Sequence, residues 1–147
     1  LERIASSRTG AIYAAHDATD ASRRYVIKQL STIALFRADE RREATRRLHA
    51  AVDRWRQVEH EAAVSIHDLL LGERDHYVVM DAVPGLSFGQ IIVSAHLAVS
   101  PDLARNWSRQ ICTLLDHLHS LPQPVYAPFL SAGHAMVTPA GTVKASL

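Results

Sequence analysis

The sequence predicts an α+β fold in two lobes, and three observations support this prediction. Residues 1–83 contain short alternating or apolar runs typical of strands, together with one long stretch of helical periodicity. The residues that follow are mostly helical in pattern. Between the two parts, the apolar run Tyr77–Asp81 leads through Ala82 and Val83 into Pro84-Gly85, a pair that stops a strand and redirects the chain. We expect Tyr77–Gly85 to be a strand that becomes a hinge; taken alone, it also fits a buried strand followed by a turn.

Composition sets the class of protein. The chain has 147 residues, 48% of them hydrophobic and 21% charged, which is typical of one globular domain. Sixteen basic and fifteen acidic residues give a net charge of +1, which demands neither nucleic acid nor an anionic membrane as a partner. There is no apolar run of about 18 residues that would cross a membrane. The single cysteine, Cys112, excludes an internal disulfide and favours a cytoplasmic location; its apolar neighbours predict a buried thiol.

Residues 1–83 should form a five-stranded antiparallel sheet with one helix. Alternation and β-branched residues predict strands at Leu1–Ala5, Ala11–His16, Tyr25–Leu30, Val64–Leu71 and His76–Met80. The long helix should run from Ala38 to about Glu59. Seven arginines lie between Arg37 and Arg56 against four acids, and no aromatic platform accompanies them, so we expect a solvated or protein-contacting face and no nucleic acid. Pairs at i,i+4 spacing are expected there, such as those of Asp39 and Glu43 with Arg42 and Arg47.

The remaining residues predict two helices and short strands. Leu86–Val93 fits a short helix, and Ser100-Pro101-Asp102 is a strong start for a helix that ends near Ser120. Short strands are expected at Val125–Tyr126, Ala135–Thr138 and Thr142–Ala145, the last two joined at Pro139-Ala140-Gly141. Nine histidines are scattered without the His-x-x-x-His spacing of a helical metal pair, so we expect no metal site.

Five segments in this order resemble the protein kinase fold, specifically the bacterial Ser/Thr kinases. Tyr25-Val26-Ile27-Lys28 is similar to the Val-Ala-Ile-Lys strand, and His60–Asp68 is similar to the His-Pro-Asn-Ile-Val segment. Tyr77–Gly85 resembles the hinge, and Ile111–His119 resembles the helix ending in Tyr-Leu-His. Met136–Lys144 resembles the strand pair after the catalytic loop. The resemblance implies a kinase-like N-lobe and hinge over 1–83 and the start of a truncated helical C-lobe over 84–147.

The resemblance also implies that the chain is incomplete. It begins at Leu1 without an initiator Met and ends at Leu147 directly after a strand-like run, so we expect a piece of a longer protein. In the family, the helix at Pro101–Ser120 packs against later helices. Those later helices are absent here, so we expect the chain to be incomplete as a folding unit and to aggregate or melt early. The apolar face of this helix consists of Leu103, Trp107, Ile111, Leu114, Leu115 and Leu118.

By the same resemblance, a nucleotide would contact Lys28 and Gly10, with Met80 as gatekeeper and Asp81 to Val83 lining an adenine pocket. Glu43 is the candidate partner of Lys28, because Arg42-Glu43-Ala44 fits the family locally. Counting back from His60 by the usual length of the family's helix places the partner position at Ala51 instead. The glycine-rich loop falls on Ala5–Gly10, where only Gly10 is retained.

The catalytic positions are replaced. The catalytic base falls on Phe129, and the two magnesium ligands fall on His134 and Leu147. The resemblance thus implies a degenerate kinase, or pseudokinase, that acts in signalling as a regulatory or protein-binding module. It implies weak ATP binding at most, no magnesium, and a protein partner or a homodimer. The alternatives are an atypical active Ser/Thr kinase and a scaffold that binds no nucleotide.

Overall fold

The chain divides into two compact units, which are described separately. The structure is a computed structural model and describes residues 1–7, 10–31, 37–73, 75–94, 98–126 and 130–146. The first unit comprises Leu1–Arg56 and Ser65–Ala82. The second comprises Gln57–Val64 and Val83–Leu147. Phe129 and Leu147, two of the predicted catalytic positions, lie outside the described residues.

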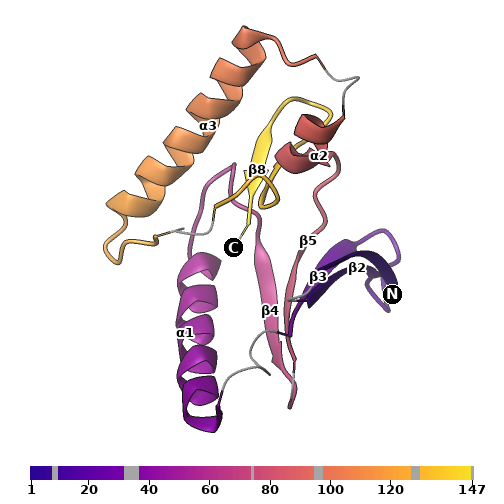
Figure 1. The fold of residues 1–147 in the computed structure, drawn as a ribbon, viewed down its shortest axis with the longest axis vertical. Helices are drawn as coiled ribbons and strands as arrows, with labels where there is room; N and C mark the ends of the chain where they lie inside the picture. The colour runs from indigo at the N-terminus through magenta and orange to yellow at the C-terminus, as the bar shows by residue number, and fades with distance from the viewer. Residues whose placement is uncertain (8–9, 32–36, 74, 95–97, 127–129, 147) are drawn as a thin grey trace. The chain divides into compact units, whose positions relative to one another are not determined.

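The first unit contains a five-stranded antiparallel sheet (Figure 1). The strands lie in the order β1-β2-β3-β5-β4, with bounds Glu2–Ser7 (β1), Gly10–His16 (β2), Arg24–Leu30 (β3), Ile66–Leu71 (β4) and His76–Asp81 (β5). The predicted sheet is therefore confirmed. The strand predicted at Val64–Leu71 begins two residues later, at Ile66. Val64 belongs to the second unit, where its N–H donates a hydrogen bond of 2.8 Å to the Ala145 carbonyl.

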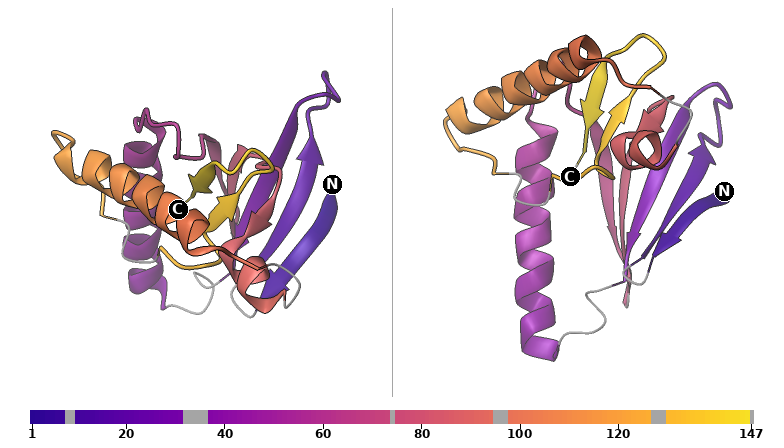
Figure 2. Two further views of the ribbon diagram at one scale, coloured as in Figure 1. Left: turned by 90° about the horizontal axis from the view of Figure 1, so that it is seen from above. Right: turned by 45° about the horizontal axis from the view of Figure 1, so that its top comes forward.

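One long helix, α1 (Ala38–Arg56), packs along the sheet of the first unit (Figure 2). Its apolar stripe buries Val52 and Trp55. The Thr45 hydroxyl contacts Nε2 of His76 on β5 at 2.9 Å, and Arg56 donates to the His67 carbonyl on β4 at 2.7 Å. The helix ends at Arg56 rather than near Glu59, and the residues that follow belong to the second unit.

The second unit combines two helices with a small sheet. Its elements are β6 (Leu86–Ser87), α2 (Phe88–Val93), α3 (Pro101–Ser120), β7 (Ala135–Val137) and β8 (Val143–Ala145), and the strands lie in the order β6-β7-β8. Helix α3 begins as predicted, because the Ser100 hydroxyl accepts a hydrogen bond from the Leu103 N–H and Pro101 occupies the first turn. Its apolar side packs on β8, where Val143 and Ala145 have no exposed surface.

Three local expectations were wrong in the second unit. The predicted helix at Leu86–Val93 begins at Phe88, because its first two residues pair with β7 as β6. Val125–Tyr126 is not a strand, since it has no ladder partner among the residues that the structure describes. Cys112 is exposed rather than buried, because it lies one residue, or about 100°, beyond Ile111 of the apolar stripe.

The apolar face of α3 is largely covered within the second unit. Leu114 and Leu118 are 1% and 0% exposed, and of the six residues only Leu103 is exposed, at 43%. The remaining three are half-buried. Strand β8 covers part of this face, and the early melting of the isolated chain stays a prediction.

Candidate functional site

Lys28 lies on the face of the sheet that α1 covers. It pairs with Ile12 on β2 and with Val78 on β5, and residues directly opposite in a ladder share a face. Val78 in turn shares its face with His76, which contacts Thr45 of α1. The side chain is half-buried, and this burial lowers the pKa of the Lys28 amine from its ordinary value.

Met80 and Asp81 point to opposite faces of the sheet. Met80 is 5% exposed and pairs with Val26, so it shares the face of Lys28. Asp81 is the next residue along β5, and successive strand residues alternate between faces. Its backbone N–H donates to the Ser65 carbonyl at 3.0 Å. Only the backbone of Asp81 could therefore contact a ligand held against Lys28 and Met80.

The Asp81 carboxylate belongs to a separate polar cluster. Its Oδ1 lies 2.6 Å from Nε2 of His67. The Tyr25 ring meets the His67 ring edge-on at a centroid distance of 5.1 Å, and the Arg23 guanidinium lies 6.0 Å from the Tyr25 centroid. The extra residue of a β-bulge between Ile66 and Asp68 is His67, which brings its ring to Asp81. Sequence analysis did not find this cluster, because its members lie on three strands and show no common spacing.

Gly10 has a structural role that needs no nucleotide. A Cβ atom at this position would lie 1.9 Å from the Gln29 carbonyl oxygen on β3, so only glycine fits. Three residues of the predicted phosphate loop lie in β1, directly after a register shift between Arg3 and Ala5: Ala5 pairs with Ile12, Ser6 with Ala11 and Ser7 with Gly10. The retained glycine is therefore explained by the close approach of β2 and β3.

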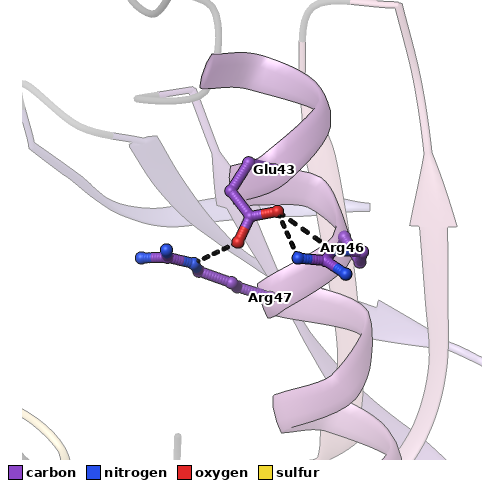
Figure 3. Close-up of polar contacts among 3 residues, drawn as sticks. All are labelled: Glu43, Arg46 and Arg47. Carbon is purple, nitrogen blue, oxygen red and sulfur yellow. Dashed lines mark hydrogen bonds and ion pairs between the residues drawn. The ribbon is translucent and has the colours of Figure 1, made fainter. Parts of the chain in front are cut away.

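Glu43 is held by arginines of its own helix (Figure 3). Its Oε1 accepts from Arg47 at 2.7 Å, and its Oε2 accepts from Arg46 at 2.6 Å. The hydrogen bonds from Arg47 and then Arg46 lower the pKa of the Glu43 carboxyl. The i,i+4 pairing expected on this helix is confirmed for Glu43 and Arg47. The predicted pairing of Glu43 with Lys28 stays a prediction, and both carboxylate oxygens already have partners.

The predicted positions of the second unit are Val83 and His134. Val83 is half-buried. His134 comes directly before β7, its N–H donates to the Ser131 carbonyl at 2.9 Å, and its Nδ1 lies 3.1 Å from the Ser131 hydroxyl. Its carbonyl accepts from the Ser146 N–H at 3.0 Å. His134 is thus fixed by backbone and side-chain contacts at the start of the β7–β8 hairpin.

Comparison with solved structures identifies the architecture. The structure of Rad53 residues 1–466 in complex with AMP-PNP superimposes with a TM-score of 0.77 at 20% sequence identity. Rad53 is a protein kinase. The chain has a kinase-like fold. The match covers 99% of this chain and 37% of that chain, so it spans the kinase-like N-lobe and the start of the C-lobe. No family model matches the sequence, and no curated protein matches it significantly.

Among the described residues, no three or more His, Cys, Asp or Glu side chains gather as a metal site would require. None of the helices there is both long and apolar enough to span a bilayer.

Proposed function

We propose that this kinase-like domain is a pseudokinase, a regulatory or protein-binding module of signalling that does not transfer phosphate. One observation carries the proposal. The residue directly before β7, which the resemblance aligns with a magnesium-binding Asn, is His134, and its Nδ1 is engaged by Ser131. Magnesium prefers oxygen ligands in octahedral geometry, so an imidazole at this point is a poor substitute. The bacterial kinases are the family to which the motifs point.

The phosphate side of the site supports the same proposal. In an active kinase, glycines let backbone amides approach the phosphates, and a Lys–Glu ion pair must be in place. Here Ala5 and Ser7 occupy glycine positions in β1, and the Glu43 carboxylate binds Arg46 and Arg47. Replacing a general base alone costs about 10²–10⁴ in rate, and loss of the metal ligands removes the charge clamp as well.

Weak, magnesium-independent nucleotide binding is part of the proposal. Rad53 was determined with AMP-PNP, and this chain offers a half-buried Lys28 and a buried Met80 on one face of its sheet. A nucleotide phosphate near Lys28 would favour the charged amine. ATP added without magnesium should therefore raise the pKa of Lys28, which NMR of the isotopically methylated amine can follow. An unchanged Lys28 signal at millimolar ATP would favour the scaffold that binds no nucleotide.

The decisive experiment is a phosphotransfer assay with radiolabelled ATP, magnesium and a generic protein substrate, beside a Lys28→Ala control. We expect no transfer by the wild type. We also expect none from the triple variant Phe129→Asp, His134→Asn, Leu147→Asp, because Ala5 and Ser7 remain. Transfer that Lys28→Ala abolishes would overturn the pseudokinase proposal and establish the atypical active kinase.

A further inference from the structure

Two histidines face one another inside the second unit. The ring centroids of His60 and His117 are 5.1 Å apart, with 40° between the ring planes. His117 lies in the last turn of α3. His60 belongs to Gln57–Val64, the connection between α1 and β4, which we call the linking segment. The contact joins residues 57 positions apart (117 minus 60), so it depends on the tertiary fold.

The linking segment is anchored on β8 as well as on α3. The Val64 N–H donates to the Ala145 carbonyl at 2.8 Å, and the Ala145 N–H donates to the Ala62 carbonyl at 2.7 Å. The Lys144 amine donates to the Glu61 carbonyl. The contact between His60 and His117 therefore attaches the linking segment to α3, in addition to its hydrogen bonds with β8.

The geometry of His60 requires a neutral ring. Its Nδ1 accepts a hydrogen bond from the Ala62 N–H at 3.0 Å. A ring nitrogen that accepts a hydrogen bond carries no proton, so the proton of neutral His60 is on Nε2. Protonating Nδ1 would set two N–H groups against each other and break this contact.

One ring nitrogen of His117 has no partner, in the part of the chain that the structure describes, to which it could donate a proton. Its Nε2 is buried and has no hydrogen-bond partner among the described residues. An imidazolium carries a proton on both nitrogens, so charging His117 would bury an unsatisfied N–H, and two charged rings at this spacing would repel each other.

The flanking residues of α3, Asp116 and His119, are exposed, as are Glu59 and Glu61 on the linking segment. On β8, the Lys144 amine binds a backbone carbonyl. Across the described ranges, neither ring makes an ion pair or hydrogen bond with a carboxylate.

We propose that His60 and His117 form a proton-sensitive latch. With both rings neutral, the linking segment stays on α3; protonation releases the side-chain contact and the Ala62 hydrogen bond. Because the linking segment joins α1 directly to β4, the latch would make the connection between these two elements more mobile at acidic pH. The proposal needs neither a nucleotide nor a protein partner, so it stands apart from the pseudokinase assignment.

Hydrogen exchange of the backbone amides tests the latch in the intact protein. Protection factors of residues 57–64, corrected for the intrinsic exchange rate, would be measured at about pH 7.5 and at about pH 5.0. We expect protection to fall by about tenfold at the lower pH, consistent with the loss of one hydrogen bond and the addition of charge repulsion. Protection that does not depend on pH would overturn the latch.

Two variants test whether the pH dependence of protection comes from the pair of His60 and His117. His117→Phe keeps a ring but cannot be protonated, so it should remove most of the pH dependence. His119→Gln is the matched control, because His119 lies in the same turn and stacks on the exposed Tyr126 at 5.5 Å; it should retain the full fall. A fall that persists in His117→Phe, or disappears in His119→Gln, contradicts the assignment.

A measurement on the wild type alone covers the case in which His117→Phe does not fold. Nitrogen NMR of the imidazoles at about pH 7.5 should show the His60 proton on Nε2, the tautomer that the Ala62 hydrogen bond requires. The Ala62 amide should lose protection as His60 becomes protonated. A proton on Nδ1 of His60 at this pH would overturn the proposal.

Discussion

Gln110 on α3 accepts a hydrogen bond from the backbone N–H of Val143 on β8, with 2.8 Å between its Oε1 and that nitrogen. Its Nε2 also donates to the Gly141 carbonyl at 3.2 Å. One amide side chain thus satisfies two backbone groups of the β7–β8 hairpin. Val143 has no exposed surface, so water cannot readily replace the side chain at that strand.

Gln110→Ala should therefore destabilise the second unit. It leaves two backbone groups unsatisfied, and we expect the free energy of unfolding to fall by about 1–3 kcal/mol, measured by urea denaturation. Arg109→Ala, at an exposed neighbouring position, should change it by less than about 0.5 kcal/mol. Equal stabilities for the two variants would show that the hairpin does not depend on Gln110.

Gly10→Ala should destabilise the first unit in the absence of any nucleotide. The new Cβ would meet the Gln29 carbonyl oxygen at 1.9 Å, so β2 and β3 must separate locally. We expect a cost of at least about 2 kcal/mol by thermal denaturation. The control is Gly89→Ala in α2, where the nearest atom would be 3.6 Å away and alanine favours the helix. An unchanged melting temperature for Gly10→Ala would contradict a structural role.

The Lys28 amine should titrate below the ordinary range of lysine. Between its lowered pKa and the ordinary value, the unfolded chain holds a proton that the folded chain has lost, so stability rises with pH in that window. Carbon NMR of the methylated amines can measure this pKa, since the chain has two lysines and Lys144→Arg assigns them. Overlapping titrations of the two amines would contradict the burial of Lys28.

Glu43→Gln should leave the pKa of Lys28 unchanged, because the Glu43 carboxylate is bound by Arg47 and Arg46. The variant should also remove a small contribution of the Glu43 carboxylate to the free energy of unfolding, one that depends on pH in the acidic range. A carboxyl with a lowered pKa stabilises the fold above its ordinary pKa, and this stabilisation is lost as the pH falls through the lowered value. A Lys28 pKa that falls further in Glu43→Gln would establish the alternative ion pair.

The arginine-rich face of α1 should not bind nucleic acid tightly. Arg46 and Arg47 are paired with Glu43, and Arg54 and Arg56 donate to the backbone carbonyls of Ala50 and His67. Fluorescence anisotropy with labelled DNA and RNA at about 50 and 200 mM salt should show no submicromolar affinity. Submicromolar binding that weakens steeply with salt would overturn this prediction.

Elements defined by local signals were predicted well. The capping Ser100 and the following Pro101 set the start of α3, and Pro122 comes soon after its end. The β-branched runs fixed β3 and β5, and the spacing of Glu43 and Arg47 predicted their ion pair. The position of Lys28 inside a strand was equally visible. In each case the determining interactions lie within a few residues along the chain, so the sequence carries them.

The tertiary structure decided what depends on distant partners. Strand β6 exists because Leu86 pairs with Val137, whereas Val125–Tyr126 has no such partner in the described part of the chain. The contact of the Asp81 carboxylate with His67 depends on the β-bulge at His67, which places the ring beside Asp81. The facing rings of His60 and His117 and the two hydrogen bonds of Gln110 have the same origin. These contacts join segments that lie far apart in the chain and are brought together by backbone pairing. No local sequence pattern encodes such contacts.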